Sequence, residues 1–234
     1  MKKRLIIALA IFVSSFIILT VLCVLIHQFR GEPLGVDIWA RDLAYNTRGE
    51  KGGLNYWFWR IITEFGDIFF VAALAIALLI YTKLDYRFLI FCLGVVTEVL
   101  LNSAFKGVYQ RPRPLTENWW MFEDSTSFPS GHSTATGFMH PYVIFILVMT
   151  EDNKKIKLPA IIVSSVLFFL VPISRIVLGM HYFTDCLAGL ALGGIVASFT
   201  ITIAILFKEY NILQNGLLSF LFKKKNKEEV KETE

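Results

Sequence analysis

Six long apolar runs, separated by short polar segments, dominate the chain. A helix needs roughly 20 apolar residues to cross the hydrocarbon core of a bilayer. Because backbone polar groups in lipid must be satisfied within each segment, apolar runs of about this length form helices. The sequence therefore predicts an all-α integral membrane protein with six transmembrane helices. Their approximate bounds are 5–27, 67–82, 88–106, 134–150, 158–178 and 184–207.

The composition supports a chain that lies in lipid. Hydrophobic residues make up 55% of the 234 residues and charged residues only 18%, whereas a soluble domain carries about 25% charged residues. The apolar stretch after "MKKR" is too long for a signal peptide and lacks a small-residue cleavage site, so we interpret it as the first span. Cys23, Cys92 and Cys186 fall within or beside predicted spans and are interpreted as packing residues.

The positions of the positive charges predict the topology, because lysine and arginine concentrate on the cytoplasmic side of membrane proteins. With the N-terminus inside, the inner segments carry 14 of the 23 lysines and arginines. We predict that both termini are cytoplasmic, that residues 1–210 form one six-helix membrane domain, and that the charged segment 211–234 is a disordered cytoplasmic tail. We expect contacts with membrane lipids and none with nucleic acid. The sequence does not predict an oligomeric state.

This topology places a long first loop, residues 28–66, outside the membrane. The loop contains "LNYWFWRIITEF", in which Trp57, Phe58 and Trp59 precede an apolar stretch. One interpretation is a helix that lies in the plane of the membrane interface, anchored by its aromatic residues. The other is an ordinary aromatic belt at the start of the second span.

Three polar clusters fall at one depth, at the outer ends of predicted spans. Lys106 ends the third span and is followed by "QRPRP". The fourth span is opened by "PSGH", residues 129–132, and the fifth is joined to the sixth by "SRIVLGMHYFTD", residues 174–185. Ionisable residues near a span are costly and by default indicate function. Since the hydropathy pattern brings all three clusters to one membrane face, we expect them to form one site.

The basic residues of these clusters suit a phosphate group. Lys106, Arg113 and Arg175 can surround it, because arginine matches phosphate oxygens with a fork of donors and lysine supplies a point charge. Ser130 and Gly131 stand where a helix begins, and free backbone N–H groups there favour an anion. The glycine also lets the backbone approach the anion closely.

The histidines suit phosphoryl transfer. His181 and Asp185 are four residues apart, which would place them on one face of a helix. A carboxylate in this position can hold one imidazole nitrogen protonated and leave the other free to attack phosphorus. His132 is then available as the acid for the leaving group. These three residues together predict phosphoryl transfer through a phosphohistidine, without a metal or another cofactor.

Other interpretations are open for single residues. Arginine and lysine at span ends, Arg111 above all, can extend to the interface without binding anything. A metal site of His132, His181 and Asp185 is possible by ligand type, although cations at the same place would repel a metal ion. His140, inside the fourth span, is interpreted as a packed or hydrogen-bonded residue of a kinked helix.

The three motifs resemble those of a known family. "KGVYQRPRP" fits K-x6-R-P, "PSGH" fits as it stands, and "SRIVLGMHYFTD" fits S-R-x5-H-x3-D. In this order they resemble the signature motifs of the type 2 phosphatidic acid phosphatase superfamily. That superfamily includes lipid phosphate phosphatases, bacterial phosphatidylglycerophosphate phosphatases, undecaprenyl diphosphate phosphatases, glucose-6-phosphatase and vanadium haloperoxidases. One departure is Phe183, which stands where many relatives have proline.

The resemblance implies a role for each matching residue. His181 would be the nucleophile, oriented by Asp185, and His132 would be the general acid. The phosphate would be held by Lys106, Arg113, Ser130, Gly131 and Arg175. These roles agree with those inferred above from charge and position.

We therefore expect a metal-independent membrane lipid phosphatase whose active site faces the extracytoplasmic side of the cell membrane. Its substrate would be phosphatidylglycerophosphate, undecaprenyl diphosphate or phosphatidic acid. Two alternatives are a vanadate-dependent peroxidase that uses the same site and a non-catalytic anion or lipid-phosphate transporter. The first is disfavoured because such relatives are mostly soluble and larger. The transporter is disfavoured because it needs no pair of nucleophile and carboxylate.

Overall fold

The computed structural model describes residues 2–82, 85–115, 117, 119–149 and 154–209. Over these residues the chain forms helices and no strand, which confirms the all-α prediction. The helices are α1 (Lys2–Gln28), α2 (Gly35–Thr47), α3 (Leu54–Glu64), α4 (Ile68–Tyr81), α5 (Tyr86–Tyr109), α6 (Gly131–Met149), α7 (Lys154–Val177) and α8 (Phe183–Glu209). The predicted tail, residues 211–234, lies outside the described residues.

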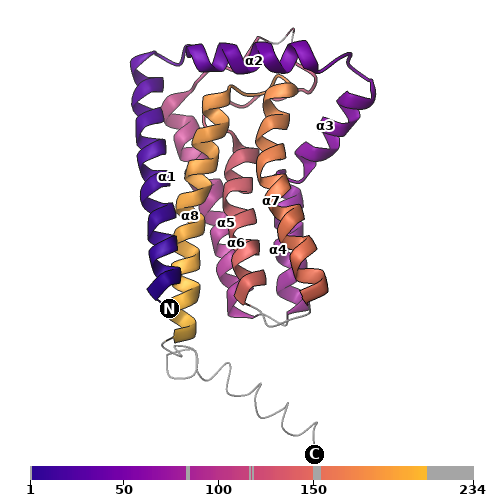
Figure 1. Cartoon of the computed structure of the whole chain (residues 1–234). Helices are drawn as coiled ribbons and strands as arrows, with labels where there is room; N and C mark the ends of the chain where they lie inside the picture. Colours follow the sequence, from indigo (N-terminus) through magenta and orange to yellow (C-terminus); the bar gives the residue numbers. More distant parts are fainter. Residues whose placement is uncertain (1, 83–84, 116, 118, 150–153, 210–234) are drawn as a thin grey trace, which may run out of the picture.

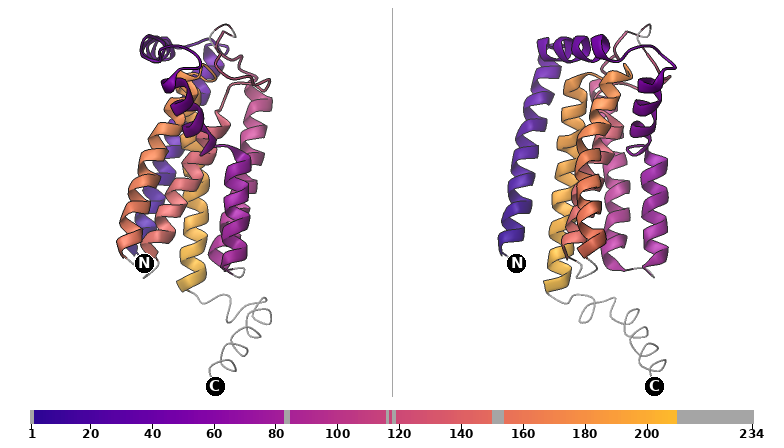
Figure 2. Two further views of the ribbon diagram at one scale, coloured as in Figure 1. Left: turned by 90° about the vertical axis from the view of Figure 1, so that its right-hand side faces the viewer. Right: turned by 45° about the vertical axis from the view of Figure 1, so that its right-hand side comes forward.

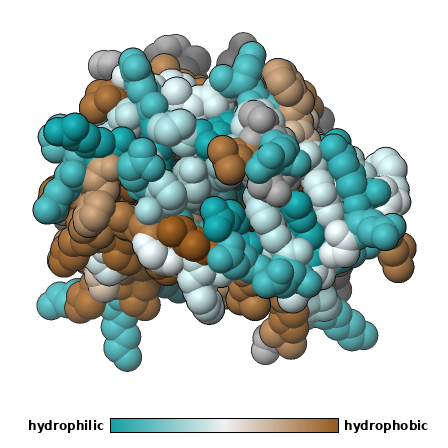
Figure 3. Space-filling view, turned by 90° about the horizontal axis from the view of Figure 1, so that it is seen from above, coloured by the Kyte–Doolittle hydropathy of each residue, from teal (hydrophilic) through white to brown (hydrophobic). Residues whose placement is uncertain are grey.

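The long helices form a bundle that α2 covers at one end. α1 and α4 to α8 run roughly side by side, while α2 lies across the bundle and α3 slants down from it towards α4 (Figure 1, Figure 2). The start of α1 and the end of α8 lie at the opposite end from α2. Hydrophilic side chains gather over much of the end that carries α2, which is called the α2 end below (Figure 3).

Four helices are long and apolar enough to cross a membrane, as judged over the described part of the chain: α1, α5, α7 and α8. A fifth crossing results if α3 and α4 form one span that is bent by 47°. The 14 residues of α4 reach only about 21 Å at 1.5 Å per residue, which is less than the roughly 30 Å of the hydrocarbon core. α6, which corresponds to the predicted fourth span, is not among these helices. Length and composition thus support four or five crossings, and six crossings with cytoplasmic termini stay a prediction.

The outward faces of the bundle carry large apolar side chains. Phe16 of α1, Leu100 of α5 and Phe169 of α7 are each more than half exposed. Contiguous apolar surface on this scale is rare on soluble monomers and indicates contact with another apolar phase. A multi-pass position in lipid accounts for it.

Glycines allow α6 and α8 to approach closely. A Cβ atom on Gly193 would lie 2.2 Å from the carbonyl oxygen of Thr134, and one on Gly189 would lie 2.6 Å from that of Ser130. Small residues at helix contacts are typical of membrane bundles, where close van der Waals contact replaces the hydrophobic effect. The two helices therefore start side by side, and the backbone N–H of Ser130 donates to the carbonyl oxygen of Asp185 (3.1 Å).

The predicted first loop contains two helices. α3 carries the aromatic segment around Trp57, whereas α2 was not predicted from the sequence. Charged residues interrupt the apolar positions of α2 at short spacing, so no long apolar run marks it. α2 is amphipathic and buries Asp37 and Ala40 against the end of the bundle.

Candidate active site

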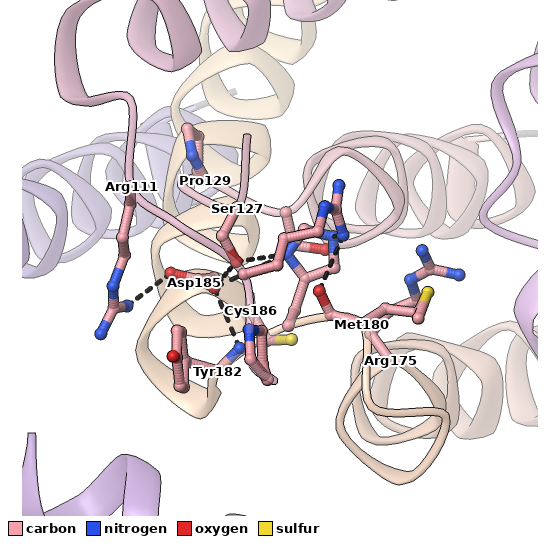
Figure 4. A network of polar contacts seen from close by, with 12 residues as sticks. Arg111, Ser127, Pro129, Arg175, Met180, Tyr182, Asp185 and Cys186 are labelled. Carbon is pink, nitrogen blue, oxygen red and sulfur yellow. Dashed lines mark hydrogen bonds and ion pairs between the residues drawn. The ribbon is translucent and has the colours of Figure 1, made fainter. Parts of the chain in front are cut away.

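The three sequence motifs meet at the α2 end, and Figure 4 shows Arg111, Pro129, Arg175 and Asp185 near one another. Arg113 follows the end of α5, His132 lies in the first turn of α6, Arg175 in the last turn of α7, and Asp185 in the first turn of α8. The contacts described below join Arg113, Arg175 and Asp185 into one network, and His132 lines a cavity that Arg175 also lines. The expectation that the motifs form one cluster is therefore confirmed in geometry, while the roles of the residues stay predictions.

His181 lies in the short link between α7 and α8. The link begins with a turn in which the N–H groups of Met180 and His181 both donate to the carbonyl oxygen of Arg175 (2.9 and 3.2 Å). Gly179 closes this turn with a φ of 77°, a conformation that favours glycine. The prediction that His181 and Asp185 share a helix face is wrong, because α8 begins only after His181. The turn brings the two side chains together instead.

The imidazole of His181 lies between a carboxylate and an arginine. Its Nδ1 is 3.6 Å from Oδ2 of Asp185 and 3.4 Å from Oγ of Ser127, and its Nε2 is 3.1 Å from Nη1 of Arg113. A guanidinium offers only donors, so Nε2 accepts from Arg113 and the ring proton lies on Nδ1. The lone pair of Nε2 therefore points towards the basic residues, as a nitrogen nucleophile requires.

The surroundings of His181 keep its ring neutral. Burial lowers the pKa of the imidazole well below its usual value, and the positive charges of Arg113 and Arg175 lower it further. The neutral form is the one that can attack phosphorus, because a protonated imidazole has no free lone pair. The environment that binds an anion thus also prepares the nucleophile.

Two arginines converge on the carboxylate of Glu123. Nη2 of Arg113 lies 2.7 Å from Oε1, and Nη2 of Arg175 lies 2.7 Å from Oε2. Arg175 is fully buried and also donates to Oγ1 of Thr63 in α3 (2.9 Å). Burial raises the pKa of Glu123, but the positive charges of Arg175 and Arg113 outweigh it and lower this pKa to about 2. A permanently charged anion therefore occupies the position predicted for phosphate.

Glu123 was not identified from the sequence. It lies in the loop between α5 and α6, which Trp120 fastens to the link between α7 and α8. The indole of Trp120 is buried, and its backbone N–H donates to the carbonyl oxygen of Leu178 (3.0 Å). No motif marks this glutamate, and its only sequence signal is an acidic position in the loop that separates the first two motifs.

Lys106 lies at the site, with its ammonium group on the loop that follows Glu123. Its Nζ contacts the carbonyl oxygen of Thr126 and lies 3.2 Å from Oγ of Ser125. Nη2 of Arg113 lies 3.0 Å from the same Ser125 oxygen. One short segment thus holds two of the predicted phosphate ligands next to each other.

Ser130 and Gly131 begin α6, as predicted. Ser130 is fully buried, and its Oγ accepts from Oγ of Ser133 at 3.1 Å. Its backbone N–H is already bonded to Asp185, so this group is not free for an anion. Gly131 lines the cavity that is described next.

His132 faces a cavity of about 370 Å³ beside the arginines. Glu123 and Arg175 line the same cavity, together with residues from the junction of α3 and α4 and from α5. Nε2 of His132 is 3.9 Å from Oδ2 of Asp67, the residue that caps α4. An imidazole that faces a cavity next to arginines that bind an anion is well placed to exchange a proton with a leaving group.

The interpretation of Arg111 as a residue that extends towards water is wrong. Its side chain is completely buried between the carboxylates of Asp37 and Asp185. Ser127, which donates to Oδ2 of Asp185, also joins this network. Neither Asp37 nor Ser127 was identified from the sequence. His140 hydrogen-bonds with a serine of α7, in agreement with its interpretation as a structural residue.

Glu123→Gln is expected to strengthen the binding of phosphate-bearing ligands. The charged carboxylate competes with phosphate for Arg113 and Arg175, whereas a neutral amide competes less. We expect the inhibition constants of inorganic phosphate and vanadate to fall by about tenfold. Asp42→Asn on α2, where the side chain is exposed, provides a matched loss of charge and should leave them unchanged. Unchanged or weaker inhibition in Glu123→Gln would show that Glu123 does not occupy the anion position.

Comparison with known proteins defines the class to which this fold and site belong. Residues 87–208, more than half of the chain, match the PAP2 superfamily. The chain therefore belongs to the PAP2 superfamily. The matched region contains all three motifs and starts near the beginning of α5, so it leaves out α1 to α4.

One protein of known name and two solved structures are similar to this chain. Phosphatidylglycerophosphatase B of Bacillus subtilis is 39% identical over 98 residues, which are 42% of this chain and 48% of that protein. This match spans only about half the length of that relative. The crystal structure of a transmembrane PAP2-type phosphatidylglycerolphosphate phosphatase from Bacillus subtilis has a TM-score of 0.67 and 28% identity, over 82% of this chain and 94% of that one. LpxE of Aquifex aeolicus shares the fold, with a TM-score of 0.58 and 21% identity over 73% and 96% of the two chains.

Proposed function

We propose that this protein is a membrane lipid phosphatase that hydrolyses a lipid phosphomonoester or diphosphate. The observation that carries the proposal is the arginine clamp, in which Arg113 and Arg175 hold an anion next to the Nε2 side of His181. A phosphate that displaces the Glu123 carboxylate meets both arginines and the nucleophile. Membership of the PAP2 superfamily supports the same conclusion.

The first step forms a phosphohistidine. Nε2 of His181 bonds to phosphorus while the bond from phosphorus to the lipid oxygen breaks. His132 gives its proton to this oxygen, so the lipid leaves as a neutral alcohol or, from a diphosphate, as a monophosphate. The charge on the transferred group is stabilised by Arg113 and Arg175, because such reactions are accelerated chiefly by positioning and electrostatics. Asp185 stabilises the positive charge that develops on the imidazole of His181.

The second step releases phosphate. A water molecule takes the position of the lipid oxygen and gives a proton to His132, which now acts as a base. The oxygen of this water bonds to phosphorus while the bond from phosphorus to Nε2 of His181 breaks. Inorganic phosphate leaves, and both histidines return to their starting states.

Phosphatidylglycerophosphate is the first substrate to test, because the relatives with matching sequence and fold are named for it. Undecaprenyl diphosphate and phosphatidic acid present the same terminal phosphate group and are the other candidates. We also propose that the site opens to the extracytoplasmic side, with both termini in the cytoplasm. The distribution of lysine and arginine supports this orientation. Labelling of an Asp42→Cys variant in intact cells by a membrane-impermeant maleimide tests it.

The experiment for the activity uses the full chain in detergent or nanodiscs. Phosphate release is measured from each of the three lipids in buffer with EDTA, and turnover numbers are compared. We expect release without added metal and a clear preference for one lipid. Absence of phosphate release from all three, by protein that is folded and monodisperse, would contradict the proposal. Halide oxidation with vanadate and peroxide would favour the peroxidase alternative instead.

The pH dependence follows from the lowered pKa of His181. Since the neutral ring is the active form, the acid limb of the profile lies at this pKa, which is well below the usual value. We expect no loss of kcat as the pH falls from about 7.5 to about 6.5, where an ordinary histidine with a pKa of about 6.5 would lose about half of its neutral form. His132 acts in its protonated form, and burial and the nearby positive charges lower its pKa, so kcat should rise as the pH falls over this range. Glu123 stays charged over this range. A profile of kcat against pH with its acid limb near neutrality would contradict the prediction.

A further inference from the structure

Arg111 is buried next to the catalytic residues, but it makes no contact with the arginine clamp that is described above. Its guanidinium donates to five acceptors, and these account for its hydrogen-bonding capacity. Nε donates to the carbonyl oxygen of Gly31 (2.9 Å), and Nη2 donates to the carbonyl oxygen of Glu32 (3.2 Å). The remaining bonds go to side chains of α2 and α8, as the next paragraphs describe.

These contacts separate Arg111 from Arg113, although the two residues are neighbours in "QRPRP". A phosphate ligand needs donors that are free to turn towards the substrate, and those of Arg111 are already satisfied by protein atoms. The group is also enclosed, because its side chain has no exposed surface and the ring of Tyr182 lies 4.3 Å from it. Arg111 is therefore not available to bind the substrate.

Arg111 instead holds the carboxylate that orients the nucleophile. Its Nη1 donates to Oδ1 of Asp185 (2.5 Å) (Figure 4). The same nitrogen donates to Oγ1 of Thr184 (2.8 Å). The other oxygen of Asp185 accepts from Ser127 Oγ and from the backbone N–H of Tyr182 (2.9 Å). Oδ1 of Asp185 thus accepts from Arg111, and Oδ2 faces His181. Contacts at both oxygens therefore fix the plane of the carboxylate.

Asp37 of α2 holds Arg111 in turn. Its Oδ2 lies 2.9 Å from Nη2 of Arg111, and its Oδ1 accepts from the backbone N–H of Thr184 (2.8 Å) at the start of α8. A carboxylate in this position caps α8, because the first N–H groups of a helix lack partners within it. Burial lowers the pKa of Arg111, but Asp185 and Asp37 outweigh this effect and raise it. The buried row of carboxylate, guanidinium and carboxylate links α2 to the catalytic pair.

We propose that Arg111, held by Asp37, is a positioning residue that sets the orientation and charge of Asp185 and, through it, the basicity of His181. The proposal rests on the proposed reaction, in which His181 attacks as a neutral base. The covering helix α2 thereby belongs to the active site, although none of its residues faces the substrate cavity.

The groups around His181 determine what loss of Arg111 does. Those that interact with its ring are Asp185, Arg113, Arg175, Glu123, Lys106 and His132. Without the positive charge of Arg111, the carboxylate of Asp185 favours the protonated ring more strongly. The pKa of His181 then rises, and the acid limb of the pH profile moves to higher pH.

The test compares variants that separate the effect of the positive charge of Arg111 from the effect of its hydrogen-bond geometry. Arg111→Lys keeps the charge and loses the fork of donors. The double variant Arg111→Gln with Asp37→Asn removes one charge of each sign, so the buried site keeps its net charge and can fold if the lysine variant does not. Arg113→Lys provides the contrast of a clamp residue, and Arg41→Lys on the partly exposed face of α2 provides the neutral control.

For the double variant we expect kcat to fall by about 10²-fold, the usual cost of a small misplacement of catalytic groups. KM should stay within about threefold, and the acid limb should move up by about one pH unit. In Arg111→Lys the limb should stay near that of the wild type, with a smaller loss of kcat. Arg113→Lys should instead raise KM and weaken inhibition by phosphate.

Two results would overturn the proposal. A rise in KM without a change in kcat or in the acid limb would make Arg111 a phosphate ligand. Unchanged kcat per mole of folded protein, with only a lower melting temperature, would make it a structural residue. Failure of the proposed function itself is recognised separately, because the wild type would then release no phosphate or His181→Ala would retain its activity.

Discussion

Phosphate release by a His181→Ala variant is expected to fall by on the order of 10⁴-fold or more, because the atom that bonds to phosphorus is removed. Nε2 of His181 is directed at the anion position by its contact with Arg113. The measurement is the initial rate of phosphate release per mole of folded protein. Rapid quenching with a phosphate-labelled lipid should give an acid-labile phosphoenzyme in the wild type and none in the variant.

His27→Ala is the matched control for this result. His27 lies exposed in the last turn of α1, at the same end of the bundle, and its loss should leave turnover unchanged. A variant that folds, lacks His181 and still forms the labelled intermediate would contradict the proposed nucleophile. Asp185→Asn should form the intermediate slowly, because the nucleophile is present but the developing charge on its ring is less well stabilised.

Arg175→Lys is expected to lower kcat/KM by about 10²–10³-fold, the usual cost of losing a donor to the transition state. The side chain is fully buried, and its guanidinium reaches both Thr63 and the anion position with separate nitrogens. Lysine keeps the charge but cannot make both contacts, since it offers one ammonium group on a longer flexible stem. The measurement is steady-state kinetics on the preferred lipid.

The control for this variant is Arg41→Lys, a substitution of the same chemistry at a partly exposed residue of α2. It should leave kcat/KM unchanged. Inhibition by vanadate provides a second readout, because an ion that resembles the transition state should bind Arg175→Lys much more weakly. Near-normal turnover in Arg175→Lys, with vanadate inhibition intact, would show that the arginine serves only to hold Glu123 and α3.

The positions of the long helices could be predicted because lipid imposes a simple condition on sequence. Every predicted apolar run coincides with a helix, with ends within a few residues. The helix α2 escaped prediction because charged residues interrupt its apolar positions at short spacing, so no long apolar run exists. The number of crossings is less determined, because α4 is short and bends away from α3.

The three motifs identified the chemical groups of the site but not all of their geometry. His181 was expected on a helix, yet the positive φ of Gly179 ends α7 and leaves the histidine in a link. Glu123 and Asp37 belong to no motif, because their positions depend on how a loop and a covering helix fold over the bundle. Motif spacing selects Arg113 and not Arg111 as a phosphate ligand, but only the tertiary structure shows that Arg111 is buried between two carboxylates.

The sequence by itself thus determined the fold class, the membrane environment and the motif residues of the site, since hydropathy and motif spacing are local properties of the chain. The tertiary structure alone decided which of these groups face the substrate and which hold the others. Arg113 and Arg175 share the carboxylate of Glu123, and Arg175 lines the cavity, while Arg111 donates to other protein atoms. Such a division depends on contacts between residues up to 147 positions apart. Those contacts arise only when burial forces every charge to find a partner.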